Sequence, residues 1–320
     1  MQDGAKPHIS VIVPAWNARD VIDRCLDSVA AQAVPGRLET IVIENGSSDG
    51  TQELLRGREL DGEIVWNSRN AGFAGSNNQG AAIARGRVLL FLNADAELLQ
   101  PETIAMLATA LDDPAVGIAG PMLLNPDGSL QPTCSAHPSL LRAAVLGLGI
   151  HRFLPARALR RVAPEFWSPD HDIDTGWLNF AALAIRADLF RELGGCWAME
   201  YGEDEDLAFR AQRRGYRVRY VSAARVMHVG NFSFGQQRSD IERAVRVARA
   251  ELTFLRTHYT RPRATAIRAI VGAGYAARAL VLGWLGRPAR ASVYRSMART
   301  YATFRAPAVR YGAGPDQPGL

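Results

Sequence analysis

The strongest constraint on the fold is a series of short apolar runs that alternate with segments of helical periodicity. The runs are rich in β-branched residues and occupy residues 9–16, 38–44, 63–67, 87–95 and 116–124. Strands that are apolar along their whole length are buried on both faces, which is typical of parallel sheets with helical crossovers. The sequence therefore predicts an α/β fold with a Rossmann-like, mostly parallel central sheet flanked by helices.

The rest of the chain divides into three patterns. Residues 125–172 are interrupted by Pro and Gly and are expected to be irregular. Residues 177–195 predict a strand followed by a helix, and residues 241–259 show the periodicity of an amphipathic helix with arginines on its outer face. Hydrophobic residues make up 48% of the chain, which excludes general disorder.

Charge is distributed unevenly along the chain. Residues 238–320 hold fifteen Arg and no Lys against four carboxylates, although the whole chain has a net charge of only +5. An acidic body with a basic tail predicts two kinds of partner, and the tail suits an anionic surface such as lipid. A solvated Arg-rich helix is the alternative, and the absence of Lys argues against nucleic acid as a partner.

The N-terminal sequence and the spacing of the cysteines favour a cytoplasmic protein. The N-terminus lacks a basic segment followed by an apolar core, and the three cysteines are too far apart for a disulfide framework or a zinc site.

Residues 269–286 are apolar apart from Arg278, and an Arg at the bilayer centre costs ~2.5–3.5 kcal/mol. We therefore expect a helix lying in a membrane interface rather than crossing it, with a helix packed on the protein body as the alternative.

Polar residues follow several of the predicted strands, at the edge of the sheet where ligands bind in such folds. Asn93 and Asp95 end one strand and share a face, so they could hold Mg²⁺ or Mn²⁺ through side-chain oxygens. His228 follows another strand and is a second candidate ligand through its neutral imidazole. Glu44 ends the second strand, where it can accept a hydrogen bond from a pyrimidine imide or a ribose hydroxyl.

The segment "NAGFAGSNNQG" at residues 70–80 combines glycines with asparagines ahead of a short predicted helix. Glycine lets a backbone approach a phosphate closely, and a helix N-terminus presents unpaired N–H groups. The segment matches neither the dinucleotide-binding pattern nor the P-loop pattern.

A cluster of acids precedes a helix near residue 206. It consists of Glu200, Glu203, Asp204, Glu205 and Asp206. The helix dipole accounts for one or two acids at this position but not for five. Clustered carboxylates raise one another's proton affinity, so the cluster predicts a general base.

These elements, in this order, resemble the family 2 inverting glycosyltransferases of the GT-A fold, particularly their bacterial rhamnosyltransferase-like branch. The similarity extends over residues 9–230. It rests on the segments "VIVPAWNARDVIDRCLDSVAAQ", "ETIVIENGSSDGT", "NAGFAGSNNQGAAIARGRVLLFLNADAEL" and "FRELGGCWAMEYGEDEDLAFRAQRRGYRVRYVSAARVMHVG".

The resemblance implies a role for each matching residue. Asp204, within the Glu203–Asp204 pair, matches the catalytic base, and Asp95 with His228 would hold the metal. The nucleotide-sugar site would comprise Pro14, Ala15, Glu44, Asn70, Gly72, Asn77, Asn93, Ala94 and Asp95, and the acceptor pocket would involve Trp177, Asp206 and Arg210. Glu44 and Asn93 each replace an Asp of the family pattern, which alters the base or ribose contact and removes one charge from the metal site.

The implied activity is that of a metal-dependent inverting hexosyltransferase of cell-envelope glycan synthesis, with Mg²⁺ or Mn²⁺ as cofactor. The donor would be dTDP-rhamnose or another dTDP- or UDP-sugar, and the acceptor would be lipid-linked or a polysaccharide. A galactofuranosyl-type or other UDP-sugar transferase and a catalytically inactive nucleotide-sugar-binding scaffold are the alternatives. Sugar nucleotidyltransfer is disfavoured because the first strand is not followed by a Gly- and Arg-rich loop.

The resemblance also implies a domain arrangement. Residues 1–237 would form the catalytic domain, with the nucleotide sugar bound by residues 1–100 and the acceptor by residues 101–237. The basic charge and the apolar stretch of residues 238–320 predict a helical extension that holds the protein peripherally on the inner face of the cytoplasmic membrane. The oligomeric state stays open between a monomer and a homo-oligomer.

Overall fold

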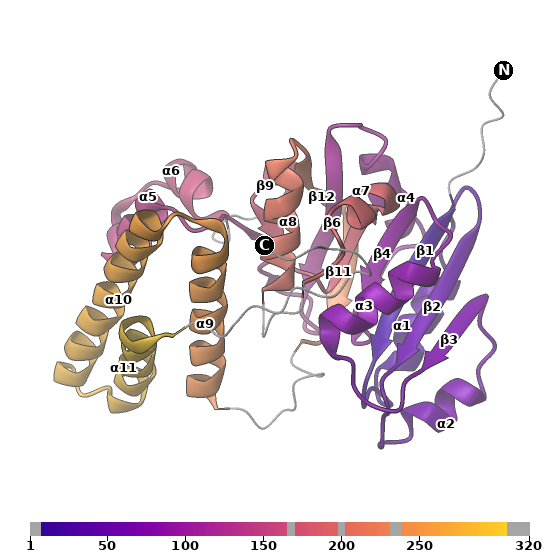
Figure 1. Ribbon diagram of the computed structural model, residues 1–320, viewed down its shortest axis with the longest axis horizontal. Helices are drawn as coiled ribbons and strands as arrows, with labels where there is room; N and C mark the ends of the chain where they lie inside the picture. Colours follow the sequence, from indigo (N-terminus) through magenta and orange to yellow (C-terminus); the bar gives the residue numbers. More distant parts are fainter. Residues whose placement is uncertain (1–7, 165–169, 198–201, 231–238, 306–320) are drawn as a thin grey trace.

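The computed structural model of the chain describes residues 8–164, 170–197, 202–230 and 239–305. Two parts lie side by side: an α/β body and a lobe made only of helices (Figure 1). Glu200 of the acidic cluster and the residues beyond 305 lie outside the described residues.

The body is built on one mixed sheet. Its strands run in the order β3 (Gly62–Trp66), β2 (Leu38–Glu44), β1 (Ile9–Ala15), β4 (Val88–Leu92), β11 (Ala182–Arg186), β6 (Val116–Leu124), β12 (Arg217–His228) and β5 (Ala96–Leu98). The pairs among β3, β2, β1 and β4 are parallel, as is the pair β6 and β12. The predicted α/β fold with a mostly parallel central sheet is confirmed.

One feature of the sheet departs from the alternating pattern. Strand β11 lies between β4 and β6 and is antiparallel to both, and β5 is antiparallel to β12. The short strands β7 (Leu130–Gln131) and β9 (Ile173–Thr175) pair antiparallel with β6 and β12, respectively. A separate pair is formed by β8 (Cys134–Ser135) and β10 (Trp177–Leu178). The insertion of β11 brings the segment just before it, residues 178–181, next to the end of β4.

Helices cover both faces of the sheet and enclose two cores. Because alternate strand residues point to opposite faces, Val11 and Val13 of β1 join one core and Ile12 joins the other. The first core includes α1 (Ile22–Ala30) and α4 (Thr103–Ala110), with α2 (Thr51–Arg56) at its edge. The second includes α3 (Gly72–Ile83), α7 (Ala187–Glu192) and α8 (Glu203–Arg213).

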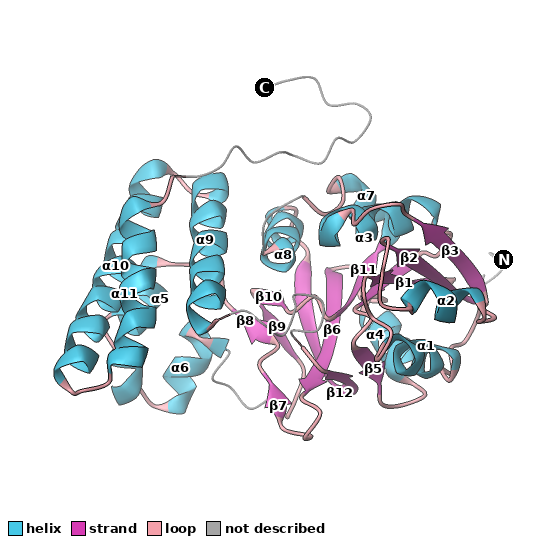
Figure 2. Cartoon of the chain, turned by 90° about the horizontal axis from the view of Figure 1, so that it is seen from below, coloured by secondary structure: helices cyan, strands magenta, loops and turns pink. Residues whose placement is uncertain are grey.

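The helical lobe joins two segments that are far apart in the sequence. It contains α5 (Leu140–Gly147), the 3-10 helix η1 (Ile150–Phe153), α6 (Ala156–Val162), α9 (Asp240–His258), α10 (Arg261–Trp284) and α11 (Pro288–Thr303), grouped at one end of the molecule in Figure 2. Its core combines Ala143 of α5 with Leu252, Leu255, Ile267 and Tyr301 of the later helices.

The expectation of an irregular region at residues 125–172 is therefore wrong for α5, η1 and α6. Helix α5 is short, and it is stabilised by contact with α10, more than 100 residues later. At this contact Gly147 and Gly274 face each other so closely that a Cβ on Gly274 would lie 2.3 Å from the Gly147 carbonyl oxygen. Two glycines thus allow the helix backbones to touch, and a local pattern does not reveal such a contact.

Helix α10 is the one helix among the described residues that is long and apolar enough to cross a membrane by length and composition. It packs against α5 and α11, while Leu280, Val281 and Trp284 near its C-terminal end are exposed. Helix α10 is thus packed within the helical lobe and leaves its C-terminal end exposed.

Candidate active site

The first polar group of the site lies where β4 ends. Asp95 follows β4 and is buried, and pairing of His228 with Ala96 at the end of β12 sets the histidine beside it. The Asp95 carbonyl also accepts a hydrogen bond from Val229 N, at 3.0 Å. His228 Nε2 consequently lies 3.4 Å from Asp95 Oδ1, so the two residues that were predicted to hold a metal lie together.

Hydrogen bonds fix the tautomer of His228. The Gln131 amide donates from Nε2 to Asn125 Oδ1 and to the His228 carbonyl, so its Oε1 accepts from His228 Nδ1–H at 2.8 Å. This leaves the Nε2 lone pair of His228 directed toward Asn93, whose Nδ2 lies 3.3 Å away. Asp95 Oδ1 is buried and has no hydrogen-bond donor among the described residues.

Two electron-pair donors, a carboxylate oxygen and a neutral imidazole nitrogen, thus face each other across a short gap. This arrangement fits a divalent cation, because Mg²⁺ and Mn²⁺ bind carboxylate oxygen and Mn²⁺ also accepts imidazole. Among the residues that the structure describes, no group of three or more His, Cys, Asp and Glu could hold a metal. Asp95 and His228 would therefore supply two ligands, and substrate phosphate or water would complete the coordination.

Glu44 is placed at the end of β2, beside Pro14 and Ala15 at the end of β1. Its carboxylate is 1% exposed and accepts hydrogen bonds from Gly46 N at 3.0 Å and Ser47 N at 2.8 Å. In this structure the side chain shapes the loop after β2 from within, so contact with a bound base would require the loop to open.

The segment at residues 70–80 differs from the expectation of a loop that precedes a helix. Helix α3 begins at Gly72, so most of this segment is helical; Asn70 Oδ1 accepts from Gly72 N at 2.8 Å just before it. Gly80 serves packing, because a Cβ at this position would lie 2.4 Å from Ile12 Cγ2. Asn77 is fully buried, and its Oδ1 has no hydrogen-bond donor.

A polar cluster that the sequence interpretation missed connects these loops. Asn45 Oδ1 accepts from Asn67 Nδ2 at 3.0 Å and from Ser76 Oγ at 3.1 Å, and Asn67 also donates to Gln79. The cluster ties the ends of β2 and β3 to α3. The asparagines at strand ends could have indicated it, since buried amides need partners on neighbouring elements.

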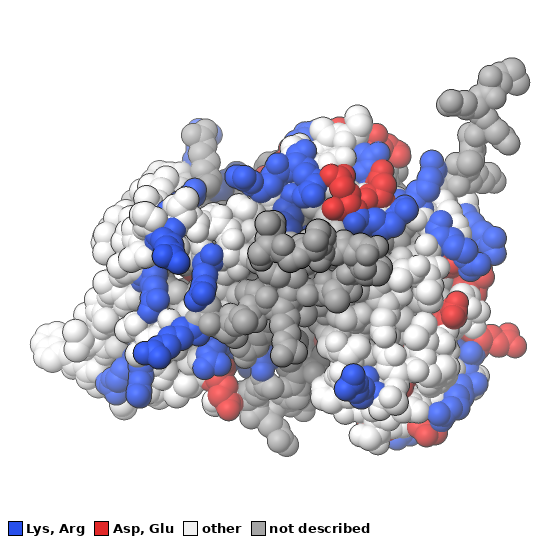
Figure 3. All heavy atoms as spheres, in the orientation of Figure 1, with Lys and Arg blue, Asp and Glu red and all other residues white. Residues whose placement is uncertain are grey.

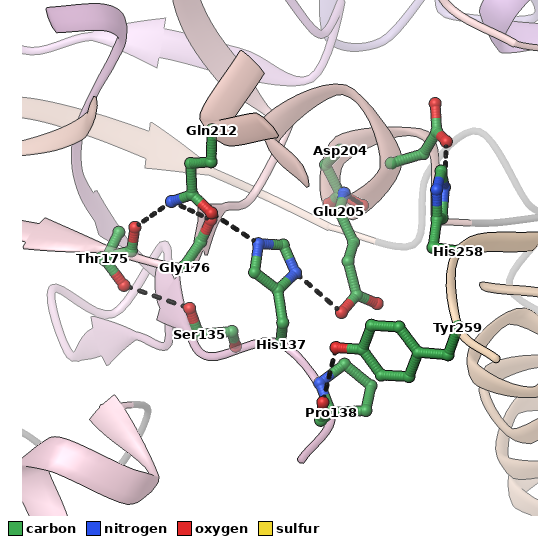
Figure 4. A network of polar contacts seen from close by, with 11 residues as sticks. Ser135, His137, Pro138, Thr175, Gly176, Asp204, Glu205, Gln212, His258 and Tyr259 are labelled. Atoms are coloured by element: carbon green, nitrogen blue, oxygen red, sulfur yellow. Dashed lines mark hydrogen bonds and ion pairs between the residues drawn. The ribbon is translucent and has the colours of Figure 1, made fainter. Parts of the chain in front are cut away.

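The acidic cluster lies in the first turn of α8, and its members have separate environments. Glu205 Oε1 lies 3.3 Å from His137 Nδ1, and the other ring nitrogen of His137 donates to Gln212 Oε1 at 2.9 Å (Figure 4). Gln212 Nε2 donates to the carbonyls of Thr175 and Gly176, which fixes its Oε1 as an acceptor. Both nitrogens of His137 thus face acceptors, and the ring bridges Glu205 and Gln212 of the same helix.

Asp206 is fully buried and is held by Arg210 and His258. Its Oδ2 accepts from Arg210 Nε at 2.8 Å, and its Oδ1 lies 2.7 Å from His258 Nε2 of α9. Arg210 also donates to the carbonyls of Leu193 and Gly195. Asp206 and Arg210 therefore lie behind the site and hold α8 against its neighbours, so they shape the pocket without reaching into it.

Among the residues that the structure describes, no cationic side chain pairs with Glu203 or Asp204. Burial raises the pKa of Asp204 to about 7, and the charge of Glu205 adds to this effect. Burial likewise raises the pKa of Glu203 to about 8, with the charges of Asp204 and Asp206 as smaller causes. The pKa values of both carboxylates are thus raised, which is the direction that the sequence predicted for the acidic cluster. Burial away from solvent contributes more to this rise than repulsion between the carboxylates.

Asp204 also borders a cavity of about 440 Å³ between the body and the helical lobe. Trp177 and Glu205 line the same part of it, while Glu203, Asp206 and Arg210 do not. A carboxylate with a pKa near neutrality in a cavity wall is suited to accept a proton from a bound hydroxyl group.

One short segment connects this carboxylate to the metal-binding residues. The backbone of Phe180 hydrogen-bonds Asp204, and the carbonyl of the next residue, Ala181, accepts from Asn93 N at 2.9 Å. Ala94 and Asp95 follow Asn93 directly. The candidate base and the candidate metal ligands are therefore held by adjacent residues of one loop, at the same edge of the sheet.

Comparison with known proteins agrees with this arrangement. Residues 10–162 match the family model of glycosyl transferase family 2. The chain is 25% identical over 244 residues to an N-acetylglucosaminyl-diphospho-decaprenol L-rhamnosyltransferase of Mycobacterium tuberculosis, covering 71% of this chain and 78% of that protein. It is 27% identical over 239 residues to the O-antigen biosynthesis protein RfbC of Myxococcus xanthus, covering 69% of this chain.

A solved structure shares the fold. The mannosyltransferase PcManGT from Pyrobaculum calidifontis, in complex with GDP-Man and Mn²⁺, superposes with a TM-score of 0.58 over 93% of this chain and 88% of that chain, at 18% identity. The chain spans only 17% of the length of RfbC and 26% of that of another curated relative.

The fold is thus that of a GT-A type α/β protein. Residues 10–162 of the chain match glycosyl transferase family 2, which supports the family predicted from the sequence.

Proposed function

We propose that the chain is an inverting hexosyltransferase that moves a sugar from a nucleoside diphosphate sugar to a hydroxyl group of a cell-envelope acceptor. The observation that carries this proposal is the position of Asp204, whose carboxylate borders the cavity and is linked through residues 180–181 to the Asp95–His228 pair.

In the proposed reaction, the acceptor hydroxyl lies against Asp204. Its oxygen forms a bond to the anomeric carbon while the bond from that carbon to the diphosphate oxygen breaks. The hydroxyl proton passes to the Asp204 carboxylate, and the bonding electron pair leaves with the nucleoside diphosphate. Attack from the face opposite the leaving group inverts the anomeric carbon.

Asp95 and His228 would hold the divalent cation of this reaction. When bound, such a cation neutralises the charge that develops on the leaving diphosphate. Gln131 supports this role, because its amide keeps the His228 Nε2 lone pair available for coordination.

Three finer features belong to the same proposal. The donor is dTDP-rhamnose or a related dTDP- or UDP-sugar, and the acceptor is a sugar on a lipid diphosphate. The name of the mycobacterial relative supports the rhamnosyl group and the lipid diphosphate. The protein acts at the inner face of the cytoplasmic membrane, and the exposed apolar end of α10 supports this location.

The experiment that tests this function is a transfer and hydrolysis assay with dTDP-rhamnose, UDP-sugars and GDP-mannose, each with Mn²⁺, Mg²⁺ or chelator. We expect metal-dependent release of nucleoside diphosphate from a dTDP- or UDP-sugar and inversion at the anomeric carbon of the product. Tight donor binding without release or transfer would instead identify the inactive scaffold and overturn the proposal.

A further inference from the structure

The cavity beside Asp204 continues into the helical lobe. Beyond Asp204 and Trp177 it is bordered by α5, α9, α10 and α11. Along α10 the lining extends from Ile267 to Arg278, which corresponds to about 16 Å of helix at 1.5 Å per residue. The cavity is therefore longer than the space that one sugar ring at Asp204 would fill.

The lobe gives the cavity an apolar wall. The wall consists of Ala143 and Leu146 of α5, Val247 and Ala250 of α9, and Ile267 and Val271 of α10. Ile267 and Ala143 are part of the lobe core, so this wall is backed by packed side chains. A wall of this kind favours an apolar chain over a second sugar.

Basic side chains border the same space. Arg142 stands in the first turn of α5, three residues after Ser139, whose hydroxyl accepts from Arg142 N at the start of the helix. Arg142 Nη1 donates to the Val162 carbonyl at 2.8 Å, which fixes the direction of the guanidinium. Arg152 and Arg278 border the cavity farther along the lobe.

The acidic groups in the lining are accounted for within the protein. Glu205 is paired with His137, and Glu251 accepts from Tyr301 Oη at 2.6 Å. Burial raises the pKa of Glu251, which favours its neutral form. Asp204 is the remaining acid, and it borders the end of the cavity that belongs to the body.

We propose that this cavity binds the carrier part of the acceptor, an isoprenoid-type lipid diphosphate. The diphosphate pairs with Arg142, the first part of the apolar chain lies along α10 between α5 and α9, and the sugar hydroxyl reaches Asp204. This inference rests on the proposed function and adds a binding site in the helical lobe.

Binding of farnesyl diphosphate, a water-soluble isoprenoid diphosphate, tests the inference by calorimetry on the full-length chain. EDTA is present so that the diphosphate does not bind through a metal at Asp95 and His228. Farnesol and inorganic pyrophosphate are measured alongside, and we expect both to bind much more weakly than farnesyl diphosphate. If either compound binds as tightly as farnesyl diphosphate, the cavity does not recognise the isoprenoid chain and the diphosphate together, which contradicts the inference.

Two variants locate the site. Arg142→Gln removes the charge, and Val247→Glu places a carboxylate in the apolar wall at a position that is 45% exposed and so tolerates substitution. Each is expected to weaken farnesyl diphosphate binding about tenfold or more. The matched controls are Arg295→Gln and Val281→Glu, which are exposed on the lobe outside the cavity and should bind like the unmodified chain.

The outcomes separate this inference from the proposed function. Equal affinity in all four variants overturns the cavity site, even if sugar transfer is observed. Absence of sugar transfer from every donor overturns the proposed function, while selective loss of farnesyl diphosphate binding in Arg142→Gln and Val247→Glu would still establish the lipid diphosphate site.

Discussion

At the scale of single residues, the first turn of α8 shows how neighbouring carboxylates acquire different properties. Glu205 contacts His137, and Asp206 contacts Arg210 and His258. Asp204 has no such side-chain partner within the described part of the chain, and burial raises its pKa to about 7. The partnered acids fix the helix, and the unpartnered one is available for proton transfer.

The raised pKa of Asp204 predicts the pH dependence of turnover. The base works only in its deprotonated form, which predominates above a pKa of about 7. We expect kcat to fall about tenfold per pH unit below this value and to level off above it. A pH–rate profile at saturating donor measures this, and a rate that stays constant from about pH 5 to pH 8 would contradict it.

The Asp95–His228 pair predicts the metal dependence of donor binding. Asp95→Ala and His228→Ala should each weaken the effect of Mn²⁺ on nucleotide binding by about 10- to 100-fold, because each removes one ligand. Titration of the nucleotide with and without chelator measures the effect. Asp112→Ala, at an exposed position, is the control; equal Mn²⁺ dependence in all three variants would argue against this site.

At the scale of elements, the contact between α3 and β1 depends on a glycine. A Cβ at Gly80 would lie 2.4 Å from Ile12 Cγ2, whereas one at Gly283 of α10 would meet nothing within 4 Å. We expect Gly80→Ala to lower the free energy of unfolding by about 1–3 kcal/mol through overpacking. Gly283→Ala should raise it by about 0.5–1 kcal/mol, because alanine favours a helix.

Denaturant unfolding of the two variants provides the measurement. Because both are Gly→Ala changes within helices, intrinsic helix preference acts in the same direction in each. Equal stability changes would show that α3 does not need the close approach to β1.

Elements formed by local patterns could be predicted from the sequence. The apolar runs predicted β1, β2, β4 and β6, because these strands are buried on both faces. Helical periodicity predicted α1 and α9. The antiparallel insertion of β11 and the helices α5 and α6 were missed, because long-range pairing determines them.

The same distinction applies to the site. Asp95, Asp204 and His228 were predicted from residue type, position at the end of a strand and family pattern. His137 and His258 were missed because their importance comes from contact with Glu205 and Asp206 of α8, which lie 68 and 52 residues away from them in the sequence. A lone histidine in a sequence carries no signal of its partner.

At the scale of the whole molecule, α8 joins the body to the helical lobe. His258 of α9 reaches Asp206 of α8, and Tyr259 Oη donates to the Pro138 carbonyl at 2.6 Å. These contacts lie next to the cavity that Asp204 borders. The lobe therefore forms one side of the proposed acceptor site.

The outer end of the lobe is predicted to contact a membrane. Leu280, Val281, Trp284 and Leu285 are 76%, 55%, 88% and 56% exposed. Figure 3 shows an uncharged outer end of the lobe with basic side chains along its face. Large exposed apolar side chains next to arginines favour an anionic bilayer.

Cosedimentation with phosphatidylglycerol-containing vesicles tests this contact. Trp284→Glu combined with Leu280→Glu should reduce binding about tenfold or more, because two apolar anchors are replaced by charges that the lipid repels. Leu99→Glu, a similar change on the body, should bind like the unmodified chain. If both proteins sediment equally with the vesicles, the membrane contact lies elsewhere.

The most direct test of the account is the turnover of Asp204→Asn together with its affinity for the nucleotide sugar. The account predicts that kcat falls by about 10²- to 10⁴-fold while the donor still binds as in the unmodified chain, since the amide keeps the shape of the carboxylate but cannot accept the proton. A variant that turns over at nearly the unmodified rate would contradict the assignment of Asp204 as the base.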